Sequence, residues 1–317
     1  MSVLQKAFLT SFFTLISFAS AQQLEEQVKV ELVQVDVVAM DSKGTLITDL
    51  TANDFVLKQN GKVQTITHFY NSANEDTRHP LTISFLIDTS YSMHERVARM
   101  TRIDIALKAA ELVMDQLLKE DQIELIEFNE KPIPVVPFTS DLAGVREKFK
   151  KLSFQEKNTA MHDSVKFAVE RIKARSGRKI IVIFSDGMDS ASKAIEEDVV
   201  DAIRRADVSI ITFYSEFARL NLPAQMGGGP GSIGRVRIRA GEDALRLYSD
   251  MTGGQFYSFK KEAELMKALE SFRGYVKSQY TLAYKPGVMK KKGFQKFKIE
   301  CKRKGVHLMH REGYWAP

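Results

Sequence analysis

Cysteine is nearly lacking from this chain of 317 residues, which has one, Cys301. A single thiol cannot form an internal disulfide, so packing alone must stabilise the protein. The chain also lacks any Asn-x-Ser/Thr sequence, the acceptor for N-linked glycans. After residue 21 it lacks an apolar run of about 20 residues, the length of a membrane-spanning helix. The first two absences fit a bacterial exported protein better than a eukaryotic extracellular one.

The first 21 residues have the features of a cleaved secretory signal. A short segment with one lysine precedes the apolar run Ala7 to Phe18, and Ala19-Ser20-Ala21 supplies the small residues that signal peptidases cut after. The alternative is an uncleaved N-terminal anchor; no cysteine follows the cleavage position to carry a lipid. We therefore expect a secreted or periplasmic protein whose mature chain begins at Gln22.

The composition, 44% hydrophobic and 27% charged, is typical of a globular protein. Residues 22–79 and 278–317 are rich in alternating strand patterns, and Asn60-Gly61 is typical of a hairpin turn in which both residues have positive φ. Neither flank has enough strands for a core of its own, so we expect the two flanks to form one small β-sandwich. The strands expected in the flanks are 28–32, 33–37, 55–59, 63–69, 279–284, 294–302 and 306–314, with a polar linker at 71–80.

Residues 80–277 alternate apolar runs with amphipathic segments of helical length. This alternation predicts an α/β domain with a Rossmann-like, doubly wound, mostly parallel sheet, inserted into the β-sandwich. Pro132 to Phe138 is expected at the sheet edge, where a missing N–H is tolerated, and Arg235–Arg239 is expected to be extended. The other expected strands are 81–87, 123–128, 179–184 and 208–214, and the expected helices are 97–118, 159–174, 194–206, 242–250 and 262–276.

Oxygen-bearing side chains follow two of these apolar strands. Asp88-Thr89-Ser90-Tyr91-Ser92 comes after the first, Ser185-Asp186-Gly187 comes after another, and Thr159 opens a helix between them. Ligands bind at the carboxyl ends of strands in open α/β sheets. Two carboxylates and three hydroxyls form an all-oxygen set suited to Mg²⁺, with Mn²⁺ or Ca²⁺ as alternatives. With few charged ligands, the ion stays electrophilic toward an incoming carboxylate.

The Asp-x-Ser-x-Ser motif, the threonine and Ser-Asp-Gly, in this order, resemble the metal-ion-dependent adhesion site of von Willebrand factor type A domains. The resemblance implies that Ser90, Ser92 and Thr159 contact the ion, and that Asp88 and Asp186 act directly or through water. An acidic side chain of a protein partner would complete the shell. The flanks, including Tyr280-x-Leu-x-Tyr284 and Gly313-Tyr314, resemble those of exported bacterial A-domain proteins of the acidobacterial type.

Other motifs are better explained without a cofactor, catalytic or metal-binding role. Gly229-Pro-Gly-Ser-Ile-Gly234 matches a dinucleotide fingerprint but is not expected between a strand and a helix, so we interpret it as a loop. His162 and Asp163 are expected in the first turn of a helix, because no serine lies in a nucleophile-elbow sequence. Ser90 replaces the second aspartate that a haloacid dehalogenase-type phosphotransferase needs. His307 and His310, three apart on a strand, point to opposite faces.

Basic residues are dense between Lys285 and Lys304. They are interpreted as a solvated edge that resists strand aggregation; the alternative is contact with an anionic envelope surface. Nucleic acid is not an expected partner of an exported chain without a reader motif.

The sequence thus predicts a non-enzymatic, metal-dependent binding or adhesion module. The main alternative is a structural or assembly protein of the cell envelope, in which the ion only stabilises loops. A metal-assisted hydrolase ranks last, because no general base is evident besides the two ligand acids.

Overall fold

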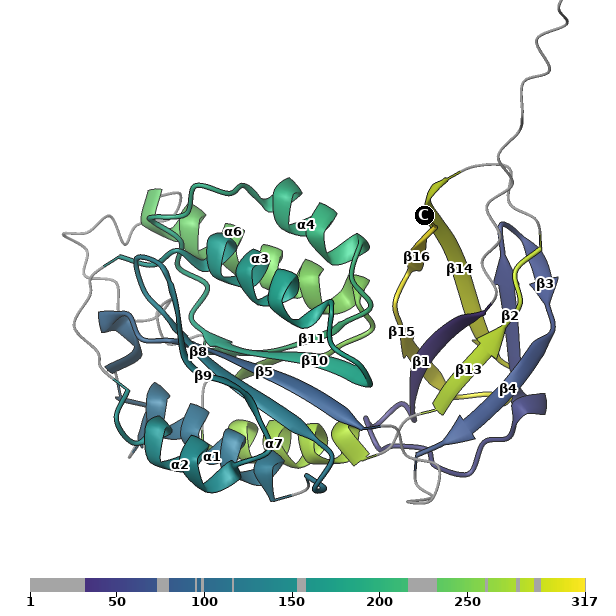
Figure 1. Cartoon of the computed structure of the whole chain (residues 1–317), viewed down its shortest axis with the longest axis horizontal. Helices are drawn as coiled ribbons and strands as arrows, with labels where there is room; N and C mark the ends of the chain where they lie inside the picture. The colour runs from purple at the N-terminus through teal and green to yellow at the C-terminus, as the bar shows by residue number, and fades with distance from the viewer. Residues whose placement is uncertain are drawn as a thin grey trace, which may run out of the picture.

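The structure is a computed structural model that describes residues 32–72, 80–94, 96–97, 100–115, 117–152, 158–215, 233–259, 262–277, 280–287 and 292–316. These residues form an α/β domain and a β-sandwich that lie side by side (Figure 1). The expected signal sequence, the strand at 28–32 except Leu32, most of the linker, and the first four residues of the Gly229–Gly234 motif lie outside the described residues. No helix among the described residues is long and apolar enough to cross a membrane.

A six-stranded sheet forms the centre of the α/β domain, with strand order β12-β11-β10-β5-β8-β9. All neighbouring strands are parallel except β9, which pairs antiparallel with β8 at the edge, as its prolines predict. The expected doubly wound, mostly parallel sheet is confirmed. The strands are β5 (Leu81–Asp88), β8 (Gln122–Phe128), β9 (Pro132–Thr139), β10 (Arg178–Ser185), β11 (Ser209–Ser215) and β12 (Phe256–Phe259).

Helices cover both faces of this sheet (Figure 1). On one face the buried cluster contains residues of α1 (Arg102–Met114), α2 (Leu142–Phe149) and α7 (Glu262–Lys277). On the other face it contains residues of α3 (Met161–Ile172), α4 (Glu196–Arg204) and α6 (Ile233–Met251). The apolar strands are buried on both sides as a result, which explains their near-continuous hydrophobic sequence.

Some expected element boundaries were wrong. The helix expected from Val97 begins at Arg102, because Thr101 and Asp104 form a capping box there, after the short ribbon of β6 (Arg96–Val97) and β7 (Met100–Thr101). Arg235–Arg239, expected to be extended, belongs to α6. Its alternating valine and isoleucine are typical of a strand, but arginine is a good helix former and the run continues into the expected helix. Helix α2 and strand β12 were not predicted.

The flanks form two antiparallel four-stranded sheets, β15-β1-β13-β4 and β16-β14-β2-β3. Strand β1 pairs with β13 from Val33 opposite Tyr284 to Val37 opposite Tyr280. The N- and C-terminal flanks thus share a sheet, and their apolar side chains share one core. The sandwich strands are β1 (Val33–Met40), β2 (Phe55–Gln59), β3 (Lys62–Gln64), β4 (Ile66–Asn71), β13 (Tyr280–Tyr284), β14 (Gly293–Cys301), β15 (His307–His310) and β16 (Gly313–Ala316).

Two expected sandwich strands are each split between the two sheets. Val63–Phe69 divides into β3, which pairs with β2, and β4, which pairs with β13. Val306–Tyr314 divides at Arg311 and Glu312, where the backbone instead contacts the α/β domain at Thr252 and Met251. The hairpin turn itself is as predicted, with positive φ at both Asn60 and Gly61.

Candidate metal centre

The candidate centre lies at the carboxyl ends of β5 and β10, two adjacent strands of the sheet. The chain proceeds from β5 to β8 and β9 on one side, then returns to β10 on the other side of β5. The reversal of strand order therefore falls between β5 and β10. Crevices at such a reversal are the usual ligand sites of open α/β sheets. Asp88 ends β5 and Asp186 follows β10, so both acids lie at this reversal.

Asp88 is fully buried, and hydrogen bonds fix both of its carboxylate oxygens. Its Oδ1 accepts from the backbone N–H of Ser90 at 2.9 Å. Its Oδ2 accepts from the hydroxyl of Ser185 at 2.7 Å. Burial, and then repulsion by the Asp186 carboxylate, raises the pKa of Asp88 to about 7, against the opposing hydrogen bonds from Ser90 and Ser185.

The two serines of the motif lie together beside Asp88. A one-turn 3-10 helix, Tyr91–His94, follows Ser90, and the Ser90 and Ser92 hydroxyl oxygens lie 3.1 Å apart. The Thr89 backbone N–H donates to the Phe128 carbonyl at the end of β8, which holds the loop against the sheet. The structure therefore brings Asp88, Ser90 and Ser92 into one cluster.

Thr159 lies in the loop before α3 and is buried. Its carbonyl accepts from the backbone N–H groups of Ser190 and Ala191, and its own N–H donates to the Ser190 hydroxyl. These bonds attach Thr159 to the segment that follows Asp186. The loop is thus at the same edge of the sheet as the other four expected residues.

Sequence reasoning missed two residues, Ser185 and Arg102, whose side chains donate hydrogen bonds to the two acids of the expected set. Ser185 precedes Asp186 directly, and its place in Ser-Asp-Gly was a usable signal. No sequence signal marks Arg102. Its guanidinium Nη1 donates to Asp186 Oδ2 and to the Ser92 carbonyl, each at 2.9 Å. Its side chain is 1% exposed. Nothing local marks an arginine at a helix start as buried.

The donor set is compatible with a hard divalent ion. Among the described residues, no group of three or more His, Cys, Asp or Glu side chains is placed to hold a metal. A site at this edge therefore depends on hydroxyl oxygens beside the two buried carboxylates, which is the chemistry that Mg²⁺ and related ions accept. Asp88, Ser90, Ser92, Thr159 and Asp186 are the residues that would hold such an ion.

The chain is similar to proteins of known sequence and structure. Residues 83–189 match the family described as the von Willebrand factor type A domain. The chain contains a von Willebrand factor type A domain. Two curated relatives, each named UPF0353 protein, come from Mycolicibacterium paratuberculosis and Nocardia farcinica and are 24% and 22% identical over 216 and 212 residues. The alignments cover 62% and 61% of this chain, and the chain spans about 62% of the length of each relative.

Solved structures of similar fold share little sequence with this A domain. The BatB protein of Bacteroides thetaiotaomicron is 15% identical with a TM-score of 0.48, covering 62% of this chain and 100% of that one. Proximal thread matrix protein 1 of the mussel byssus, in a structure with a zinc-occupied MIDAS motif, is 14% identical with a TM-score of 0.49. That match covers 69% of this chain and 50% of the mussel chain.

His162 and Asp163 begin a helix, as the sequence predicts. They lie in the first turn of α3 in the A domain. Asp163 accepts hydrogen bonds from the backbone N–H groups of Lys193 and Ala194, and His162 Nδ1 lies 2.8 Å from the Tyr248 hydroxyl. Both side chains therefore hold segments of the A domain together.

Part of the basic run of the sandwich is neutralised by its neighbours. Arg303 forms a bidentate pair with Asp49, and Lys298 and Lys58 both contact Glu300. The expected edge position is wrong for β14, which carries Lys296 and Lys298 and lies between β16 and β2 in the sheet. Lys290 and Lys291 lie outside the described residues.

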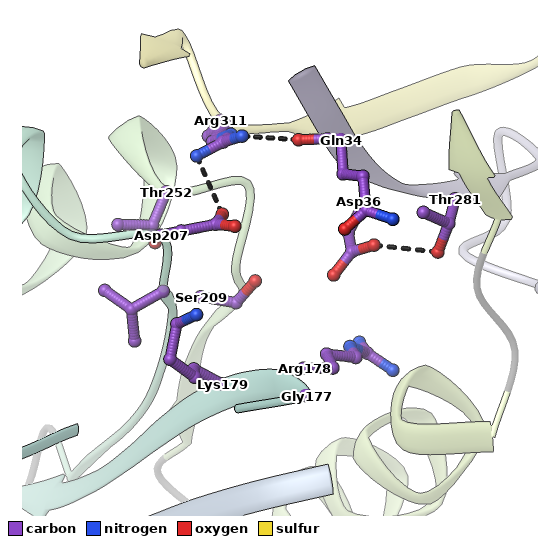
Figure 2. Close-up of a pocket in the computed structure, with 11 residues that line it drawn as sticks. Gln34, Asp36, Gly177, Arg178, Lys179, Asp207, Ser209, Thr252, Thr281 and Arg311 are labelled. Atoms are coloured by element: carbon purple, nitrogen blue, oxygen red, sulfur yellow. Dashed lines mark hydrogen bonds and ion pairs between the residues drawn. The ribbon is translucent and has the colours of Figure 1, made fainter. Parts of the chain in front are cut away.

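A second polar feature is a cavity of about 160 Å³ at the opposite end of the A-domain sheet, against the sandwich (Figure 2). Asp36 of β1 enters it from the sandwich side and accepts a hydrogen bond from Thr281, while burial raises its pKa. Arg178 and Lys179 line it from the start of β10. Arg311 contacts Asp207 and the Gln34 carbonyl across its rim. The junction of the two domains is therefore polar and charged.

Proposed function

We propose that this chain is an exported, non-enzymatic binding protein that holds one divalent ion and binds the carboxylate of a protein partner through it. Asp88, Ser90, Ser92, Thr159 and Asp186 supply the oxygen ligands. The ion, Mg²⁺ with Mn²⁺ or Ca²⁺ as alternatives, would bind the partner's acidic side chain in a coordination position that the chain leaves open. A secreted or periplasmic location is part of the proposal, and the signal sequence expected at residues 1–21 supports it.

The observation that carries this proposal is the arrangement of Asp88, Ser90 and Ser92. The hydroxyl oxygens of Ser90 and Ser92 lie 3.1 Å apart, next to a buried carboxylate. Adjacent ligands of an octahedral ion with bonds of about 2.0–2.1 Å are about 3 Å apart, and they are farther apart around the larger Ca²⁺. The two hydroxyl oxygens, which hydrogen-bond to each other, are therefore close enough to be adjacent ligands of one ion.

The proposal assigns no catalysis to the A domain. In the described part of the chain, the acids placed at the centre, Asp88 and Asp186, are both assigned as ligands, which leaves neither free as a general base. The ion's role is then to accept an oxygen of the partner. The basic run at 285–304 is a candidate second contact with an anionic envelope surface, and nucleic acid is not proposed as a partner.

The alternative is a structural or assembly role in the cell envelope, with an ion that only stabilises loops. Thr159 distinguishes the two. Thr159→Val keeps the shape of the side chain and removes its oxygen, whereas Thr159→Ser keeps the oxygen. If binding is the function, Thr159→Val should lose Mg²⁺-dependent capture of a glutamate-rich peptide while still folding, and Thr159→Ser should keep it. A glutamine-rich peptide controls for the carboxylate.

The first experiment is thermal unfolding of the chain from Gln22 onward, in EDTA and in Mg²⁺ or Mn²⁺. An ion that binds only the folded state raises the melting temperature. We expect such a rise in the wild type and in Asp201→Asn, an exposed carboxylate on α4, and no rise in Asp88→Ala. Calorimetry that detects no ion binding by the wild type or by variants with a changed centre would refute the metal site.

A further inference from the structure

Helix α1 of the A domain begins with a buried cation. Arg102 is the first residue of the helix, directly after the capping residue Thr101. A positive charge is unfavourable at a helix N-terminus, where the helix dipole is positive, and burial of a guanidinium costs free energy unless it is paired. The position of Arg102 therefore needs a strong local partner.

That partner belongs to the candidate metal centre. Arg102 Nη1 lies 2.9 Å from Asp186 Oδ2, and the paired side chains are 1% and 0% exposed. The same nitrogen donates to the carbonyl of Ser92. One guanidinium thus joins the segment after β10 to the Asp-x-Ser-x-Ser loop after β5, the two segments that a bound ion would also join.

The charges explain what this contact does. When both are ionised, Asp88 and Asp186 repel each other in a buried site, and a nearby cation offsets this repulsion. Arg102 supplies one positive charge from within the chain and occupies one oxygen of Asp186. A divalent ion arriving at the centre meets this charge and competes for this oxygen.

We propose that Arg102 is a built-in counter-cation that holds the centre together without a metal and lowers its affinity for a divalent ion. This inference rests on the proposed function, because it concerns the same centre. Arg102 is a positioning residue here: it acts through Asp186 and Ser92. The A domain then stays folded when the ion is lost, and occupancy of the centre follows the concentration of the ion outside the cell.

The test compares Arg102→Met, which keeps much of the length of the side chain but not its charge, with the wild type. Mg²⁺ and Mn²⁺ binding is measured by calorimetry, and unfolding is followed in EDTA and in saturating ion. We expect Arg102→Met to melt several degrees lower in EDTA, since Asp186 becomes a buried unpaired charge. We expect it to bind the ion at least about tenfold more tightly and to gain more melting temperature from the ion than the wild type does.

Two further variants keep the test decisive. Arg178→Met removes another buried arginine, at the opposite end of β10, where it donates to the carbonyls of Tyr275 and Val276. It should lower stability and leave ion affinity unchanged.

A second variant serves if Arg102→Met does not fold in EDTA. Arg102→Lys keeps the charge on a smaller donor group and should fold and bind the ion no more tightly than the wild type. Arg102→Met is then prepared with Mn²⁺ present throughout, and rescue of its fold by the ion is the expected result.

The outcomes distinguish the metal site from the counter-cation role of Arg102. Equal or weaker ion binding by Arg102→Met beside a wild type that binds would overturn the counter-cation and leave the metal site standing. No binding by either protein would overturn both. Binding by Arg102→Met alone would support the counter-cation in its strongest form, since the arginine would then exclude the ion.

Discussion

Ser185 Oγ donates a hydrogen bond of 2.7 Å to Asp88 Oδ2, joining the last residue of β10 to the last residue of β5. The same oxygen accepts from the backbone N–H of Gly187 at 3.0 Å. One hydroxyl therefore sets the relative position of the two acidic segments. These segments follow β5 and β10, the two strands between which the strand order of the sheet reverses.

Ser185→Ala is predicted to destabilise the A domain by about 1–3 kcal/mol, because it leaves a buried carboxylate oxygen and a buried N–H short of a partner. Urea unfolding measures the change. Ser209→Ala is the control: this serine is also buried, but lies at the start of β11, at the other end of the sheet. Equal losses in the free energy of unfolding would show that the hydrogen bond to Asp88 stabilises the domain no more than an ordinary buried serine does.

Gly241 of α6 packs directly on the segment after Asp186. A Cβ at this position would lie 1.6 Å from the carbonyl oxygen of Gly187. Because backbone cannot move aside as a side chain can, Gly241→Ala is predicted to lower the free energy of unfolding by about 3 kcal/mol and to weaken ion binding. Chemical denaturation and calorimetry measure the two effects.

Gly274→Ala on α7 is the matched helical control for Gly241→Ala. Its added Cβ would meet the terminal Cδ1 of Leu46 at 2.3 Å, and a flexible leucine can rotate away. Alanine also favours the helix by up to about 1 kcal/mol over glycine. We expect a small change in stability and none in ion binding. A loss as large as that of Gly241→Ala would contradict the close-approach argument.

His310 of β15 gives the sandwich a predictable dependence on pH. Its Nε2 accepts from the Ile299 N–H at 3.2 Å, and Nδ1 lies 2.7 Å from the Arg311 carbonyl, to which it donates as N–H. This neutral ring is partly buried, and its removal from water lowers its pKa below the usual 6.5. Below about pH 6.5 the unfolded chain binds more protons at this residue than the folded chain does. Stability from His310 is therefore present above that pH and is lost as pH falls toward the folded-state pKa.

Thermal unfolding at pH 7.5 and 5.5 tests this dependence. We expect His310→Gln to lose less melting temperature on acidification than the wild type, by a few degrees. His307→Gln, an exposed histidine on the same strand, should behave as the wild type does. Identical acid sensitivity in all three proteins would show that protonation of His310 is not coupled to folding.

Much of the A domain could be predicted from local patterns. Apolar runs such as that before Asp88 indicated buried parallel strands, and the proline-containing run from Pro132 indicated the antiparallel edge. Helix α2 and strand β12 were missed, and residues 235–239 were expected to be extended but are helical. Other errors were at boundaries that depend on contacts. Thr101 and Asp104 start α1 later than its apolar periodicity indicates, because a capping box outweighs the pattern. The division of Val306–Tyr314 depends on contacts of Arg311 and Glu312 with the other domain, which no local pattern encodes.

The sequence by itself determined the five oxygen-bearing residues of the candidate centre, their order, and the strand–helix alternation that brings Asp88 and Asp186 to one edge. These features are local, because motif spacing and hydrophobic period are properties of neighbouring residues. Only the tertiary structure decided that Arg102 pairs with Asp186, 84 residues away, and that β1 pairs with β13 across the inserted domain. Such pairings depend on how distant segments pack and on which buried charges need partners, and that information lies in the three-dimensional arrangement rather than in any stretch of the chain.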